Sequence, residues 1–352
     1  MNALSGRDTP GCDHRVLVTG AGGFIGSHVA ADQARRGHVV VALDRELDAV
    51  GHLASMGRFE LVRGDIADAE VRAAALRDVQ TVFHLAAVHL SVSATETEFQ
   101  RTNVMATREL AELAVALGVR RFVHVSTAGV YGRIKEPPAD EKTECRPEIA
   151  YERTKLAGET VVREVAERSG MELVILRPVW VYGPGCHRTE KLLRAVSRNR
   201  FVMGGRGDRL RHSVYIRDMV EACHLSANAA RASGETLVIG DDRAVSVREL
   251  LETVASITGA RPPRRAPLAL LWLGGFLAET VFRVLPGEPP LSRRTLKFFT
   301  GNSSFDTRRA RELLGFSPRY DLRRGIAETY DILRENEEWQ VPLPEVESVV
   351  TS

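Results

Sequence analysis

Three glycines spaced three residues apart follow a short apolar strand and begin a helix near the start of the chain. The strand covers residues 16–19, and the glycines are Gly20, Gly23 and Gly26. A turn of this composition lets backbone N–H groups approach a pyrophosphate at the N-terminus of the following helix, where the helix dipole favours an anion. The pattern therefore predicts a strand–turn–helix unit that binds a dinucleotide.

The same alternation of strand and helix recurs through the first half of the chain. A helix expected from Phe24 ends at Gly37, and a strand follows at residues 38–43. Glycines stand in the same way before strands expected at residues 121–126 and 172–177. Strands that alternate with helices of this length predict an α/β fold with a doubly wound parallel sheet.

Composition narrows the class of protein and its location. The 352 residues carry 48 Lys and Arg against 46 Asp and Glu, which argues against nucleic acid as a partner. The four cysteines show no C-x-x-C spacing and are interpreted as free thiols of a reducing compartment; they are Cys12, Cys145, Cys186 and Cys223. Residues 1–14 lack the apolar core of a secretory signal, and we expect a cytoplasmic protein.

One apolar segment, residues 268–285, is nearly long enough to cross a bilayer. Glu279 and Arg283 stand four residues apart on one face of the expected helix. The opposite face is expected to carry apolar side chains, namely Leu270, Leu273, Leu277, Val281 and Val284. We therefore expect an amphipathic helix folded over the substrate pocket, and keep a peripheral membrane contact or a true span as alternatives.

Asp44 ends the second strand, 24 positions after Gly20. A carboxylate at this place can accept a hydrogen bond from the ribose 2′-hydroxyl, which favours NAD because a 2′-phosphate would face a negative charge. Arg45 keeps NADP open, since a guanidinium there can pair with that phosphate. The alternative role of Asp44 is to cap a helix.

Tyr151 and Lys155 stand four residues apart and project from one face of a helix. A tyrosine with its ordinary pKa of roughly 10 is a poor base at neutral pH. Two cations about 5 Å away, the ammonium and a nicotinamide ring, would each favour the phenolate by roughly 3 kcal/mol at an effective dielectric of about 20. The pair is therefore predicted to perform acid–base chemistry, the alternative being an ordinary surface helix.

A hydroxyl stands upstream of this pair, at the end of the strand expected at residues 121–126. Ser126 or Thr127 could hold a substrate oxygen, because ligands bind at the carboxyl ends of parallel strands. Capping of the next turn is the alternative for either residue.

With these residues in hand, the chain resembles the extended short-chain dehydrogenase/reductase family, which includes nucleotide-sugar epimerases and dehydratases and the 3β-hydroxysteroid dehydrogenases. The resemblance runs from about Arg15 to Arg334. Its motifs, in family order, are G-x-x-G-x-x-G, Gly64-Asp65-Ile66, His84-Leu85-Ala86-Ala87, Y-x-x-x-K and Arg177-Pro178 followed by Tyr182-Gly183-Pro184.

The resemblance implies roles for residues that spacing alone leaves open. It places the catalytic hydroxyl on Thr127, so that the triad is Thr127, Tyr151 and Lys155, and makes Asn103 a structural residue. It also implies a homodimer through a helix pair that includes the Tyr151 helix. The cofactor-binding residues expected in all are Gly20, Gly23, Phe24, Ile25, Gly26, Asp44, Arg45, Asp65, Ile66, Leu85, Ala86, Ala87, Tyr151, Lys155 and Pro178. No metal ligand is predicted.

Departures from the family pattern narrow the reaction. Ala128 and Gly129 stand where related dehydratases and decarboxylases carry acidic residues, so neither reaction is expected. Trp180 replaces an asparagine that holds the diphosphate in many nucleotide-sugar enzymes, and favours an apolar ligand. Arg211 favours the opposite conclusion, because it aligns with an arginine that often binds diphosphate. His89 is the remaining residue predicted to contact substrate.

The expected organisation is a tail at residues 1–14, an NAD-binding Rossmann domain at 15–178, a smaller substrate-binding lobe at 179–340 and a second tail at 341–352. Segments near 213–240 are expected to return to the first domain. Helices of the lobe are expected near residues 191–198, 247–258 and 307–314.

The function predicted from these residues is NAD(P)-dependent interconversion of a secondary alcohol and a ketone on a bulky, largely apolar small molecule, such as a sterol-like or polyketide substrate. The first alternative is a nucleotide-sugar 4-epimerase that retains its NAD. The second is a dinucleotide-binding regulator without turnover, which the complete triad disfavours.

Overall fold

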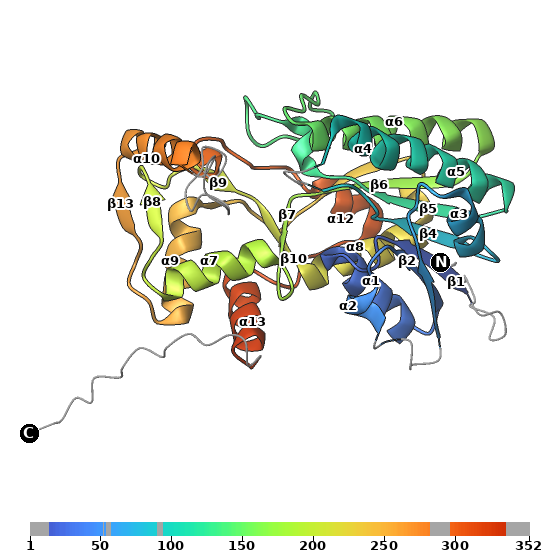
Figure 1. Cartoon of the computed structure of the whole chain (residues 1–352), viewed down its shortest axis with the longest axis horizontal. Helices are drawn as coiled ribbons and strands as arrows, with labels where there is room; N and C mark the ends of the chain where they lie inside the picture. The colour runs from blue at the N-terminus through green and yellow to red at the C-terminus, as the bar shows by residue number, and fades with distance from the viewer. Residues whose placement is uncertain (1–13, 52, 54–57, 90–93, 282–295, 336–352) are drawn as a thin grey trace, which may run out of the picture. The chain divides into compact units, whose positions relative to one another are not determined.

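The computed structural model describes residues 14–51, 53, 58–89, 94–281 and 296–335 (Figure 1). Its largest element is a seven-stranded sheet. In spatial order the strands are β11 (Thr236–Ile239), β6 (Glu172–Pro178), β5 (Arg121–Val125), β4 (Thr81–His84), β1 (Arg15–Thr19), β2 (Val39–Asp44) and β3 (Phe59–Arg63). Each neighbouring pair from β6 to β3 is parallel, which confirms the predicted doubly wound α/β fold.

Helices cover both faces of this sheet. Figure 1 shows α4, α5 and α6 along one face and α1 on the other. The helices of this part are α1 (Phe24–Arg35), α2 (Asp48–Gly51), α3 (Ala69–Ala75), α4 (Glu96–Gln100), α5 (Thr107–Ala116) and α6 (Ala150–Ser169), with a π-helical turn, η2 (Arg101–Ala106), between α4 and α5. The core beneath α5 and α6 joins apolar side chains of the central strands, such as Leu17 and Phe122, to Leu110 and Val162 of these helices.

The glycines after two of these helices act as predicted. Gly37 follows α1 with φ at +93°, and Gly170 ends α6 in the left-handed conformation with φ at +77°. The strand that follows Gly37 begins at Val39, one residue later than expected.

The chain divides into two compact units. The first contains the described residues up to Ser126 together with Ile149–Leu176 and Cys223–Thr236. The second contains Thr127–Glu148, Arg177–Ala222 and the described residues from Leu237 onward. The predicted tails lie outside the described residues, except for His14.

Short sheets and helices build the second unit. Its strand pairs are β10 (Ser213–Tyr215) with β7 (Trp180–Tyr182), β12 (Val245–Ser246) with β9 (Leu210–Arg211), and β13 (Arg264–Ala266) with β8 (Val202–Gly204). Its helices include α7 (His187–Ser197), α9 (Val247–Thr258), α10 (Leu268–Val281), α12 (Arg308–Leu314) and α13 (Leu322–Glu335), while α8 (Ile216–Asn228) continues from this unit into the first. The three predicted lobe helices correspond to α7, α9 and α12.

The two segments expected to return to the large sheet behave differently. Thr236–Ile239 does so, as β11. Ser213–Tyr215 instead pairs in parallel with Trp180–Tyr182 in a separate two-stranded sheet. The sequence pattern of a short apolar strand cannot distinguish these partners, because both offer the same backbone hydrogen-bonding groups.

The predicted orientation of the apolar helix was wrong. Leu270, Leu273 and Leu277, expected to face the protein, are 62%, 57% and 55% exposed on α10. Leu268 and Leu271 face inward instead, and a methyl group added at Gly204 would lie 3.1 Å from each of them. Arg283 and Val284 lie outside the described residues, as do the side chains of Glu279 and Val281.

Two further expectations concern the membrane and the thiols. Within the described ranges, no helix combines the length and the apolar character that crossing a bilayer requires. Cys186 and Cys223 are free thiols, as predicted, and no disulfide joins Cys145 to either of them. Cys12 lies outside the described residues.

Candidate active site

The turn between β1 and α1 has no room for a side chain at Gly20 or Gly26. Gly20 adopts φ +73°, and a methyl group on it would lie 2.7 Å from the backbone nitrogen of Ala86. A methyl group on Gly26 would lie 1.9 Å from the carbonyl oxygen of Gly20. Gly23 is the N-cap residue of α1, so the turn leads directly into the positive end of a helix. This cradle fits the pyrophosphate of a dinucleotide.

Gly22 is an essential member of the turn that the spacing argument missed. A methyl group on Gly22 would lie 1.8 Å from the carbonyl oxygen of Glu46. Its N–H donates to Oδ2 of Asp44 at 3.0 Å. The doubled glycine at positions 22 and 23 was the available signal.

Asp44 therefore joins the turn to the end of β2. Oδ1 of the same carboxylate accepts from the backbone N–H of Glu46 at 3.2 Å. A carboxylate offers about four acceptor positions. Acceptor capacity therefore remains for the ribose hydroxyls, while Arg45 next to it is exposed.

The turn after β4 is bound to β1 through buried hydroxyl and imidazole groups. The backbone N–H groups of Leu85 and Ala86 each donate to Thr19 Oγ1 at 3.2 Å. Thr19 Oγ1 lies 2.8 Å from His84 Nδ1, and His84 Nε2 lies 2.9 Å from Thr107 Oγ1. Burial, together with the charge of Lys155, lowers the pKa of His84 to about 3, so its ring is neutral. A neutral ring can accept at Nδ1 from Thr19 and donate at Nε2 to Thr107.

Asn103 connects this turn to α6. Its side-chain oxygen accepts from the N–H of Val88 at 2.8 Å, and its Nδ2 donates to Val88 O at 3.2 Å and to Thr154 Oγ1 at 3.0 Å. Asn103 is 1% exposed, which fits the structural role implied by the family resemblance. The contact fixes the residues after β4 against the helix that carries Tyr151 and Lys155.

Asp65 and Ile66 follow β3 at the same edge of the sheet. Asp65 Oδ1 accepts from the N–H of Ala67 at 2.9 Å, which orients the carboxylate. The side chain of Ile66 is only 5% exposed and belongs to the hydrophobic core. A cofactor contact by Ile66 would therefore use its backbone.

Lys155 is buried on α6, with Nζ donating to the carbonyl oxygen of Val125 at 2.8 Å. Burial lowers its pKa to about 8, and the charge of Glu159 acts in the opposite direction. Glu159 is itself buried and accepts from Ser126 Oγ at 2.5 Å. A carboxylate therefore lies one helical turn beyond the lysine. The sequence prediction did not include Glu159, although its spacing of four residues from Lys155 was the available signal.

Tyr151 lies one turn before Lys155 on the same helix and is half-buried. Its ring meets that of His89 edge to face, with the centroids 4.8 Å apart. His89 is exposed, so the two rings form an aromatic contact at the surface of the first unit. The roles assigned to these side chains stay predictions.

Thr127 begins a short 3₁₀ helix, η3 (Ala128–Tyr131), in the second unit. Its Oγ1 accepts from the N–H of Gly129 at 3.0 Å. Thr127 is thus a cap, and because this bond uses an acceptor position, the hydroxyl can still donate its hydrogen to a substrate oxygen.

Trp180 and Arg211 differ in how they are held within the second unit. Trp180 is half-buried on β7, with its ring centroid 5.9 Å from that of Tyr182. The Arg211 guanidinium donates to the carbonyl oxygens of Leu210 and Gly301, both at 2.6 Å, and to that of Phe298. Burial lowers the pKa of Arg211 to about 10. Pro178 is buried at the end of β6.

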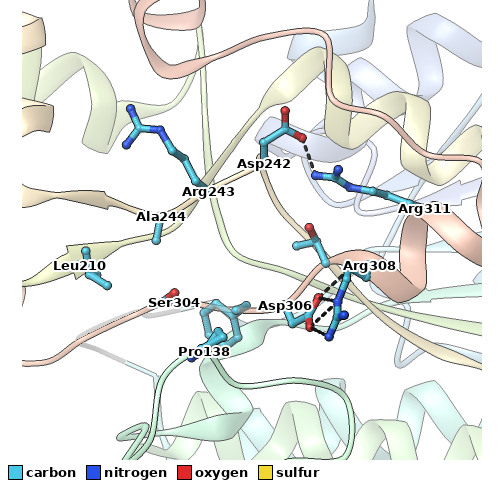
Figure 2. Close-up of a pocket in the computed structure, with 11 residues that line it drawn as sticks. Pro138, Leu210, Asp242, Arg243, Ala244, Ser304, Asp306, Arg308 and Arg311 are labelled. Carbon is cyan, nitrogen blue, oxygen red and sulfur yellow. Dashed lines mark hydrogen bonds and ion pairs between the residues drawn. The ribbon is translucent and has the colours of Figure 1, made fainter.

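A cavity of about 440 Å³ in the second unit contains none of the predicted site residues. Figure 2 shows its charged lining. Asp242 pairs with Arg311 at 2.5 Å, and Asp306 pairs with Arg308 at 2.6 Å. Arg243, the third arginine of the lining, pairs with Glu249. Because each arginine of the lining is paired with a carboxylate, the lining has no strong net charge that would select an anionic or a cationic ligand.

Comparison with known proteins identifies the family. Residues 16–240 match the NAD dependent epimerase/dehydratase family, and the chain belongs to this family of enzymes. This confirms the resemblance stated from the motifs.

Similar proteins include more than one kind of enzyme. The chain is 30% identical to the UDP-glucose 4-epimerase of Mycolicibacterium smegmatis, over 91% of this chain and 98% of that protein. It is 28% identical to a 3 beta-hydroxysteroid dehydrogenase/Delta 5-->4-isomerase of Mycobacterium tuberculosis, over 89% of each. The solved structure of MoeE5 in complex with UDP-glucose and NAD is 33% identical, with a TM-score of 0.72, and covers 91% of this chain and 99% of that one.

Proposed function

We propose that this protein is an NAD-preferring dehydrogenase or ketoreductase that interconverts a secondary alcohol and a ketone on a bulky, largely apolar substrate. Bound NAD would supply the hydride acceptor or donor at nicotinamide C4. Tyr151 exchanges the proton of the substrate oxygen, Lys155 holds the ribose and favours the phenolate by its charge, and Thr127 orients the oxygen.

The preference for NAD rests on Asp44. Its carboxylate stands at the end of β2 and already accepts from the N–H of Gly22 in the glycine turn. A ribose diol can donate to the acceptor positions that remain, whereas the 2′-phosphate of NADP would meet a like charge.

The hydrogen bonds that hold Arg211 support the choice of an apolar substrate over a nucleotide sugar. Three main-chain carbonyls receive hydrogen bonds from its guanidinium, which has five N–H donors in all. A diphosphate would have to compete with these carbonyls for a bidentate contact. Together with Trp180 in place of an asparagine, this arrangement favours an apolar substrate over a nucleotide sugar.

Nucleotide-sugar 4-epimerisation is the second candidate, because the epimerase of M. smegmatis and the UDP-glucose complex of MoeE5 are among the similar proteins. The same three side chains would then serve a cycle in which NAD is reduced and reoxidised on one bound sugar.

Two measurements separate these candidates. NAD-dependent turnover on a panel of hydroxysteroids, with UDP- and dTDP-hexoses as the comparison, is expected to give activity on the hydroxysteroids. Background rates on the steroids beside clear conversion of the hexoses would reject the proposal. Acid denaturation of the purified protein is expected to release little NAD, whereas one NAD for each chain would favour the epimerase.

A further inference from the structure

Helix α10 presents an apolar face whose side chains are exposed among the residues that the structure describes. Five large apolar side chains on this helix are more than a third exposed; they are Leu270, Trp272, Leu273, Phe276 and Leu277. At about 100° for each residue, these positions lie on one side of the helix. Folded monomers seldom leave a contiguous apolar patch of this kind without a function.

The opposite side of α10 packs against the second unit. Leu268 and Leu271 lie against Gly204 of β8, and Gly275 is buried. Figure 1 shows α10 beside β13 and β8. One face of the helix therefore holds it in place, while the large side chains of the other face point outward.

Exposed positive charge directly precedes this apolar helix in the chain. Arg261, Arg264 and Arg265 are exposed, and the last two lie on β13, which precedes α10 by a single residue. Residues 259–278 contain these three arginines and no acidic residue. Val202, which is paired with Arg264 across the small sheet, is also 42% exposed.

We propose that α10 docks on the surface of an anionic lipid bilayer, with its axis in the plane of the membrane. The helix has 14 described residues, a length sufficient to lie in the interface of a bilayer, and within the described ranges no helix is long and apolar enough to cross one. The exposed leucines enter the acyl boundary, Trp272 lies at the headgroup level, and the arginines meet the anionic headgroups.

The charges favour a lipid surface over a second copy of the chain. A symmetric contact between two copies uses the same patch on both. Such a contact would bring arginines of one copy toward arginines of the other, because residues 259–278 hold no acidic residue and the first carboxylate, Glu279, follows at the C-terminal end of α10. An anionic bilayer satisfies both the apolar face and the arginines that precede it.

The inference does not depend on the substrate, and it is tested by vesicle flotation of the full-length protein. Wild type is expected to float with phosphatidylcholine vesicles that contain phosphatidylglycerol, and at least about tenfold less with pure phosphatidylcholine. Leu273→Ser/Leu277→Ser should reduce flotation at least about tenfold through lost apolar burial. Arg264→Gln/Arg265→Gln should reduce it by about tenfold or more, and raising the salt should do the same to wild type.

Leu117→Ser is the matched control. Leu117 is 50% exposed but lies at the end of α5 in the first unit, so its replacement should leave flotation unchanged. All variants should keep the melting temperature of wild type within a few degrees, which separates loss of docking from loss of folding.

Fluorescence gives an independent readout. Trp272 should shift to the blue and be quenched by brominated acyl chains on anionic vesicles, and Trp272→Phe should remove that quenching. The proposal is overturned if wild type remains with the soluble fraction, or if the Arg264/Arg265 variant floats as wild type does. It is overturned equally if the Leu273/Leu277 variant turns a wild-type dimer into a monomer while no vesicle binds, because a second copy would then cover the face.

Discussion

Replacing Glu159 by glutamine is expected to shift the pH at which the protein loses its affinity for NAD. Lys155 is buried on α6, and its Nζ donates to Val125 O at the end of β5. Titratable groups near it include Glu159, which favours the ammonium, and the buried rings of His84 and His124, whose own pKa values are lowered by burial and by the charge of Lys155. Tyr151 stands one turn before it on α6. Glu159 is therefore the carboxylate whose charge raises the pKa of Lys155.

The size of the effect follows from the pKa of Lys155, which is about 8 in the presence of Glu159. Removing a nearby opposite charge lowers such a pKa by about one unit at the lower end of the usual range. At about pH 8 the protonated fraction would fall from about one half to about one eleventh, so NAD would bind about fivefold more weakly. At about pH 6 both forms are at least about nine-tenths protonated, and the affinities should agree.

Isothermal titration of NAD between about pH 6 and pH 9, at constant ionic strength, measures this shift. Glutamine keeps an amide oxygen that can accept from Ser126, so the local hydrogen bond need not be lost. Ser126→Ala is the control, because it removes that bond but keeps the carboxylate, and it should retain the wild-type midpoint. Equal midpoints for wild type and Glu159→Gln, or a loss of affinity that is uniform with pH, would refute the electrostatic role of Glu159.

Three further outcomes test other parts of the site. Tyr151→Phe should lower turnover by about 10²–10⁴ while NAD still binds, and wild-type turnover would exclude the phenol from proton transfer. Gly22→Ala would place a methyl group 1.8 Å from the carbonyl oxygen of Glu46, so urea denaturation should show a loss of at least about 2 kcal/mol. Gly51→Ala, where no described residue lies within 4 Å of the added methyl group, should show little change. Burial lowers the pKa of Lys155 from 10.5 to about 8. Between about pH 8 and pH 10.5 the unfolded chain therefore keeps a proton on Lys155 that the native protein has released. Relative to Lys155→Met, the wild-type unfolding free energy should therefore rise by about 3 kcal/mol as pH increases from about 8 to 10.5, and a constant difference would contradict the buried state of this lysine.

The parts of the fold that depend on neighbouring residues could be predicted from the sequence. Glycine punctuation located α1 and α6, and the repeated strand–helix unit determined the parallel sheet. Asp44 could be placed at the end of β2 because a strand-end carboxylate after a glycine turn has few alternatives in a sheet of this kind. Each of these inferences uses residues close together in the chain.

Helix α10 shows where that approach fails. Its apolar residues occupy every side of the helix, so the sequence contains no polar stripe that would identify the solvent face. The pair Glu279 and Arg283 suggested one, but it lies at the end of the segment. Only the packing of Leu268 and Leu271 against Gly204 determines which side faces the protein.

The hydrogen-bond partners of Thr19, His84 and Asn103 could not be predicted for a different reason, although the family resemblance had marked His84 and Asn103. Thr19, His84 and Asn103 come from β1, β4 and η2, and a parallel sheet brings them together although more than 60 residues separate Thr19 from His84. Their hydrogen bonds attach the turn after β4 to β1 on one side and to α6 on the other. Because a buried polar group left without its partner is costly, these contacts favour one arrangement of the glycine turn and the Tyr151 helix over alternatives. The reactive pair therefore owes its position to side chains that take no part in the chemistry.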